Sequence, residues 1–143
     1  KINTQTFIYL DTIACVAPIG LFLGRIANFV NGELFGKPTN LSWSVIFSKT
    51  DNIPRHPSQL YEAALEGVLL FIILISLIYN KNIKTGYCSG LFLILYGFFR
   101  ILSEQFREPD ENIGYIFDLF SMGSFLSSIM IIAGIIILTK IKK

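Results

Sequence analysis

The run LFSMGSFLSSIMIIAGIIILT (residues 119–139) contains no charged residue. A helix needs roughly 20 apolar residues to cross the hydrocarbon core of a bilayer, so this run alone predicts a transmembrane helix. The remainder of the chain agrees with it, because 52% of the residues are hydrophobic and the mean hydropathy is +0.59. These values are typical of an integral membrane protein and not of a water-soluble domain.

Three shorter charge-free runs precede it, at residues 12–24, 67–80 and 85–99. Each becomes long enough to span a bilayer only if it includes neighbouring charged residues, namely Asp11, Glu62 with Glu66, and Arg100 with Glu104. We expect spans at about residues 7–24, 60–79, 87–105 and 119–139, all helical because a lone span must satisfy its own backbone hydrogen bonds. The predicted fold is an all-α integral membrane protein with about four transmembrane helices, forming a single membrane domain over residues 1–143.

Charged side chains inside a span need a partner, since a charge at the bilayer centre costs about 2.5–3.5 kcal/mol on insertion scales. Arg100 and Glu104 are four residues apart, which places them on one helical face and predicts an ion pair. For Asp11, Glu66 and Asp118 the favoured interpretation is a position near a helix end, from which the carboxylate reaches water.

The lysines indicate the orientation of the chain. Six of them lie near the two termini and in the connector NKNIKTGY (residues 80–87), and none of these segments contains an acidic residue. The positive-inside rule therefore favours a cytoplasmic location for that side. The opposite, outer side then holds a polar loop at residues 25–58. Within it, GKPTNLSWSVIF (residues 36–47) combines turn residues with an alternating apolar run, which predicts a short strand or hairpin.

The last span begins with small and polar residues. Asp118 or Ser121 could serve as its N-cap. A packing face of small residues is expected from Gly123, Ser124, Ser127 and Ser128.

Three polar segments are predicted to meet at the outer membrane boundary. They contribute Arg25, Asn28, Asn31 and Glu33 from the first, His56, Gln59, Tyr61 and Glu62 from the second, and Arg100, Glu104 and Arg107 from the third. The planar guanidinium of arginine binds phosphate through two parallel hydrogen bonds. Two arginines at headgroup depth therefore predict a phospholipid headgroup site.

Other residues in these segments have weaker signals. His56 is the only histidine, and a structural role is favoured over that of a base. The segment from Arg107 to Asp110 is interpreted as a solvated turn. Gly24, Gly32 and Gly36 permit close packing or unusual backbone angles.

Several classes of function have no support. A net charge of +2 without a basic patch predicts no nucleic-acid partner. Cys15 and Cys88 lie in apolar segments and are expected to be buried free thiols, and no metal-binding motif is present, so neither a metal nor another cofactor is predicted. A transporter fragment and a non-catalytic interaction subunit remain alternatives to an enzyme.

Four blocks in order resemble the prolipoprotein diacylglyceryl transferase family. They are GRIANFVNGELFG (residues 24–36), RHPSQLYEAALEGVLLFIIL (55–74), SGLFLILYGFFRILSEQFREPD (89–110) and SMGSFLS (121–127). Ala27 stands where the family usually has glycine, and Ser124 where glutamine is common. The resemblance covers the C-terminal portion of a family fold of about seven spans. It implies a missing N-terminal half, which carries a histidine-glycine segment used in catalysis.

The resemblance also implies a reaction, with phosphatidylglycerol as donor and the lipobox cysteine of a prolipoprotein as acceptor, at the outer face of the bacterial inner membrane. Carried onto this sequence, Arg25 binds the lipid phosphate, while Arg100, Glu104 and Asn28 are catalytic. The supporting residues are Glu33, Gly36, His56, Tyr61, Glu62 and Arg107.

Overall fold

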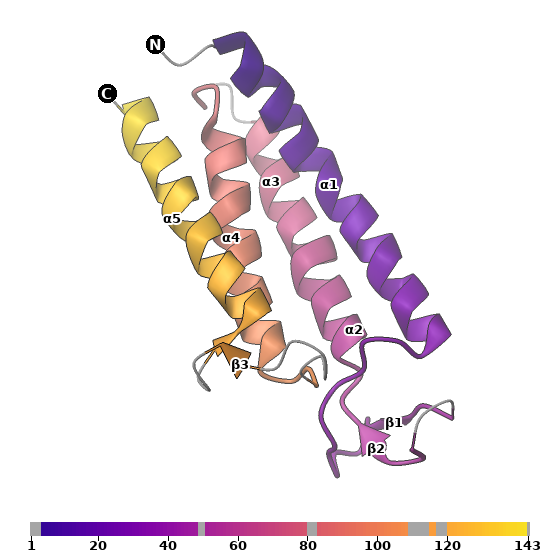
Figure 1. Cartoon of the computed structure of the whole chain (residues 1–143). Coiled ribbons are helices and arrows are strands. Elements are labelled where there is room, and N and C mark those ends of the chain that lie inside the picture. The colour runs from indigo at the N-terminus through magenta and orange to yellow at the C-terminus, as the bar shows by residue number, and fades with distance from the viewer. Residues whose placement is uncertain (1–3, 49–50, 80–82, 109–114, 117–119, 143) are drawn as a thin grey trace.

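The computed structural model describes residues 4–48, 51–79, 83–108, 115–116 and 120–142. Four membrane-length helical segments lie side by side, with both ends of the described chain at the same end of the bundle (Figure 1). They are α1 (Thr4–Asn31), the continuous segment α2 (Ser58–Glu62), η1 (Ala63–Leu69) and α3 (Leu70–Ile78), then α4 (Tyr87–Glu104) and α5 (Met122–Lys142). The predicted fold class of a four-span helical membrane protein is confirmed.

Helix α1 continues seven residues beyond the predicted span end, from Gly24 to Asn31. It stops at Gly32, whose φ of 72° is readily available only to glycine. The amide of Gly32 donates to the carbonyl of Phe29 (3.1 Å), and that of Glu33 donates to Asn28 (2.9 Å), which is the Schellman pattern of a helix C-terminus. Arg25 is therefore held on a helix and not in a loop.

Glycine allows the helices to approach closely. A Cβ built on Gly67 of η1 would lie 2.6 Å from Cβ of Phe22 on α1. Between α4 and α5, a Cβ on Gly97 would lie 2.7 Å from the carbonyl oxygen of Ser127, and one on Gly134 would lie 2.6 Å from that of Gly90. The predicted small-residue face on the last helix is correct for Gly123 and Ser127, which lie against α4, but Ser128 is exposed.

Side chains bind the N-termini of α5 and α4. Ser121 Oγ accepts a hydrogen bond from the amide of Ser124 (3.1 Å), as expected of the α5 N-cap, whereas Asp118 lies outside the described residues. Asp11 was predicted to reach water, but its carboxylate binds the N-terminus of α4. It accepts from the amides of Gly86 (2.6 Å) and Ser89 (2.8 Å). A carboxylate there satisfies amides that have no partner within the helix.

A small lobe covers the opposite end of the bundle, beneath α2 (Figure 1). Strand β1 (Val45–Ile46) confirms the short strand predicted within residues 36–47, and it pairs with β2 (Pro54–Arg55), which lies beyond that segment. A second antiparallel pair joins β3 (Tyr115–Ile116) to β4 (Phe120–Ser121). Gly36 fastens the lobe to the end of α4: a Cβ there would lie 2.5 Å from the carbonyl oxygen of His56 and 2.6 Å from that of Phe106.

Replacing Gly134 by valine should weaken the α4–α5 contact, since the new side chain would meet the Gly90 backbone. We expect a loss of about 1–3 kcal/mol in the free energy of unfolding, the usual cost of overpacking. The measurement is circular dichroism during SDS titration in mixed micelles. Gly20→Val is the matched control, because nothing lies within 4 Å of a Cβ at Gly20. Equal stability of the two variants would contradict the close contact.

Candidate functional site

Two fully buried carboxylates form the centre of the candidate site. Glu62 and Glu66 are each 0% exposed and lie one helical turn apart, at the end of α2 and within η1. The seven-residue π-helix η1 immediately follows Glu62, and π-helical turns occur frequently at functional sites. A buried ionised carboxylate needs an opposite charge, and in this site arginines provide it.

Arg25 of α1 binds both carboxylates. Its Nε lies 2.9 Å from Glu62 Oε2, and its Nη2 lies 3.2 Å from Glu66 Oε2. The edge of the guanidinium formed by these two nitrogens is therefore used within the protein.

Arg100 of α4 approaches the same carboxylates. Its Nη1 is 2.8 Å from Glu62 Oε1 and 3.7 Å from Glu66 Oε1. Its Nη2 is 2.8 Å from Glu104 Oε2, which confirms the ion pair predicted from their spacing. Ser103 Oγ also lies 3.3 Å from Glu66 Oε1. Glu104 in turn lies against α5, because a Cβ on Gly123 would be 3.0 Å from Glu104 Oε2.

Arg107 is buried near Glu62, contrary to the solvated turn expected there. It is only 7% exposed and its Nη1 lies 3.7 Å from Glu62 Oε1. Its backbone pairs with that of Gly36 in an isolated antiparallel bridge. Among the described residues, the charge network thus contains three arginines (Arg25, Arg100, Arg107) and three glutamates (Glu62, Glu66, Glu104), whose formal charges sum to zero.

The arginines retain donors for a ligand. Among the described residues, none accepts a hydrogen bond from Nη1 of Arg25 or from Nε of Arg100. The two arginine side chains are 14% and 12% exposed. The glutamates therefore fix the guanidinium groups in place while leaving part of each available to an anion.

The other predicted site residues lie around this network. Asn28 is half-buried one helical turn after Arg25. The side chain of Glu33 is exposed, and its backbone carbonyl instead accepts from Nε2 of the buried Gln59 (2.6 Å). The carboxylate of Glu33 has no described contact with the charge network. The backbone carbonyl of Glu33 instead links the beginning of α2 to the end of α1.

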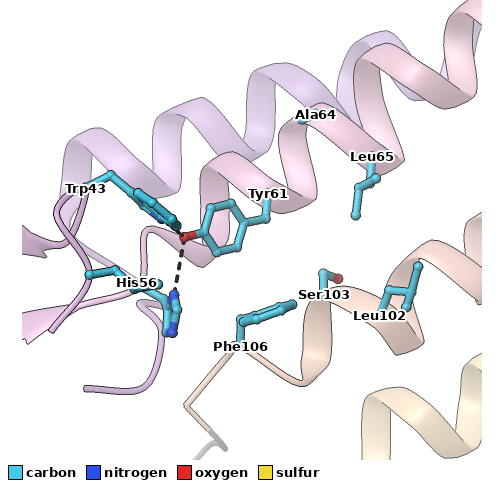
Figure 2. Close-up of a pocket in the computed structure, with 9 residues that line it drawn as sticks. Trp43, His56, Tyr61, Ala64, Leu65, Leu102, Ser103 and Phe106 are labelled. Carbon is cyan, nitrogen blue, oxygen red and sulfur yellow. Dashed lines mark hydrogen bonds between the residues drawn. The ribbon is translucent and has the colours of Figure 1, made fainter. Parts of the chain in front are cut away.

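His56 and Tyr61 line a separate apolar cavity next to the network (Figure 2). Tyr61 OH lies 3.2 Å from His56 Nδ1 and accepts a hydrogen bond from Trp43 Nε1 (2.8 Å). The rings of His56, Tyr61 and Phe106 pack edge to face, with centroids 5.3–5.9 Å apart. This packing supports the predicted structural role of His56.

The lobe has an ion network of its own, centred on Arg55. Nη1 of Arg55 binds the carbonyl oxygen of Gly36 (3.1 Å) and the carboxylate of Glu108 (3.0 Å), and Nη2 binds Asp51. The hydrogen bond that Arg55 donates to the Asp51 carboxylate raises the pKa of the guanidinium. These bonds keep the lobe closed over the end of the bundle.

Known proteins are similar to this chain along most of its length. The family model described as prolipoprotein diacylglyceryl transferase matches residues 1–140. A phosphatidylglycerol–prolipoprotein diacylglyceryl transferase of Rickettsia bellii is 54% identical over 132 residues, covering 91% of this chain and 50% of the relative. The enzymes of the same name from Rickettsia akari (58% over 126 residues; 87% and 49%) and Aeromonas hydrophila (51% over 134 residues; 94% and 48%) are similar in the same way. The chain spans about half the length of the curated relatives it matches.

Removing the central carboxylate should destabilise the bundle. In Glu62→Ala, Arg25 and Arg100 lose a shared partner inside the protein, and breaking such a buried pair costs about 3–5 kcal/mol. The unfolding free energy in mixed micelles measures this loss. Glu33→Ala, which removes an exposed carboxylate, is the control and should change stability little. If the two variants unfolded alike, the glutamate would not be holding the arginines.

Proposed function

Because the chain belongs to the prolipoprotein diacylglyceryl transferase family, we propose that it takes part in transferring the diacylglyceryl group of phosphatidylglycerol to a cysteine thiol of a prolipoprotein. The proposal locates it in the bacterial inner membrane, with the lysine-rich end in the cytoplasm and the charge network near the outer face. The observation that carries it is the pair of glutamate-held arginines, Arg25 and Arg100, joined across three helical segments.

In the proposed reaction, the acceptor thiolate attacks the glyceryl carbon that is bonded to the phosphate oxygen. A carbon–sulfur bond forms, the carbon–oxygen bond breaks, and glycerol phosphate leaves with the electron pair. An ordinary thiol has a pKa of about 8.5, so a base must remove its proton. We propose that this base belongs to the part of the family protein that this chain does not span.

The described residues would bind and orient the donor. Arg25 would hold the lipid phosphate through Nη1, and Arg100 would stabilise the departing phosphate through Nε, with Glu104 fixing its orientation. Donors that are already aligned stabilise developing charge without reorganising during the reaction. Glu62 and Glu66 would act as positioning residues, because they fix both guanidinium groups without needing to touch the substrate.

A second candidate is a truncated, non-catalytic remnant or interaction subunit. The coverage of about half the length of its relatives favours it. Both candidates can be tested in phosphatidylglycerol liposomes containing a peptide with the acceptor cysteine. The chain is assayed alone and with the N-terminal half of the Rickettsia bellii relative.

We expect the peptide to gain one diacylglyceryl group by mass spectrometry only in the mixture. Modification by the chain alone would show that the described residues include the base. No modification in either, while an intact relative is active in the same liposomes, would leave only a non-catalytic role.

Arg25→Lys should lower the rate of peptide modification in the active preparation by about 100- to 1000-fold, or 2.7–4 kcal/mol, by analogy with loss of an oxyanion donor. Lysine keeps the charge but lacks the planar fork that binds two glutamates and a phosphate together. Lys140→Gln, at the opposite end of the bundle, is the control. Retention of full activity by Arg25→Lys would show that the planar guanidinium is not needed at this position.

A further inference from the structure

The apolar cavity beside the charge network has a volume of about 520 Å³ and lies between α2–η1 and α4 (Figure 2). Ala64 and Leu65 line it on one side and Leu102 on the other. Trp43, His56, Tyr61 and Phe106 also line it. The volume lies within the range of about 300–1,000 Å³ that ligand pockets occupy.

Near the lobe, the cavity is lined by Tyr61 and His56, which share a hydrogen bond. Tyr61 OH accepts from Trp43, and its single hydrogen is then available to His56 Nδ1, 3.2 Å away. With Nδ1 as acceptor, the neutral imidazole carries its hydrogen on Nε2. Among the described residues, none accepts a hydrogen bond from this nitrogen. The cavity thus combines hydrocarbon walls with a histidine ring among its lining residues.

The cavity and the charge network share a wall. Ser103 lines the cavity, and its hydroxyl also lies 3.3 Å from Glu66 Oε1, which binds Arg100. A ligand with an anionic group at the arginines and a hydrocarbon group attached to it could therefore occupy both.

We propose that this cavity binds the first methylenes of one acyl chain of a glycerophospholipid, with the ester carbonyl accepting from His56 Nε2. The proposal rests on the proposed function for the position of the phosphate. A peptide segment fits less well, because each of its backbone groups would need a hydrogen-bond partner and the hydrocarbon walls offer none. An acyl chain needs no partner there, and from Leu65 and Leu102 it can continue along the lipid-facing helix surfaces.

Trp43 is the only tryptophan in the sequence and lines the cavity, so its fluorescence reports on what the cavity binds. The experiment titrates the full chain in detergent with phosphatidylglycerol brominated on the acyl chain near the ester, and bromine quenches the tryptophan on contact. We expect saturable quenching. Ala64→Phe, which fills the cavity, should weaken the apparent affinity about tenfold, equivalent to displacing roughly two buried methylenes.

Val68→Phe is the matched control, since Val68 is 45% exposed one turn further along the same segment and does not line the cavity. It should quench like the wild type, and circular dichroism should show both variants folded. Leu102→Phe provides a second obstruction from α4. Quenching that does not saturate, or that is unchanged in both obstructed variants, would overturn the proposal. So would saturable quenching by an apolar brominated peptide with none by the lipid.

Brominated phosphatidylcholine separates this proposal from the function on which it rests. If the cavity binds acyl chains but the arginines do not recognise phosphatidylglycerol, both lipids should quench equally, and both should be blocked by Ala64→Phe. If the arginines recognise the headgroup but the cavity is not used, quenching should prefer phosphatidylglycerol and survive Ala64→Phe. Agreement with both proposals requires preference for phosphatidylglycerol together with loss in the obstructed variant.

Discussion

Glu62 and Glu66 are completely buried in an apolar helix bundle, and they can stay ionised only beside positive charge. This requirement constrains the neighbouring helices. Arg25 must reach them from α1 and Arg100 from α4, so three segments distant in the sequence have to converge within about one side-chain length. Gly67 meets part of this demand, because it brings η1 directly against Phe22 of α1.

The same constraint extends to the parts of the molecule that do not touch the glutamates. Arg100 is fixed on its other side by Glu104, and Glu104 lies against Gly123 at the beginning of α5. At the lobe, Gly36 permits the backbone pairing that buries Arg107 near Glu62. A side chain at Gly123 would enter the space of the Glu104 carboxylate, and one at Gly36 would meet the backbones of His56 and Phe106. The network therefore depends on backbone approach as much as on charge.

Interactions local in the sequence could be predicted, and those set by packing could not. The four spans follow from hydropathy, and the Arg100–Glu104 pair follows from a spacing of four residues. Glu66 was expected near water, because a single sequence does not indicate that arginines on two other helices will face it. Asp11 was misjudged for the same reason, since its partners are backbone amides 75 and 78 residues away. The end of α1 was set too early, because Arg25 breaks the apolar run but not the helix, which ends only at Gly32.

The charge balance of the network separates its structural role from its chemical role. Three glutamates offset three arginines, so the described part of the chain can hold these charges inside a membrane without a ligand. Each carboxylate is shared or paired at one edge of a guanidinium, and none of the described residues accepts from Nη1 of Arg25 or Nε of Arg100. A phosphate that binds these donors would meet guanidinium groups that are already partly desolvated and held in one orientation by the glutamates. Pre-organisation of this kind reduces the cost of binding an anion, and here it comes from the glutamates as much as from the arginines themselves.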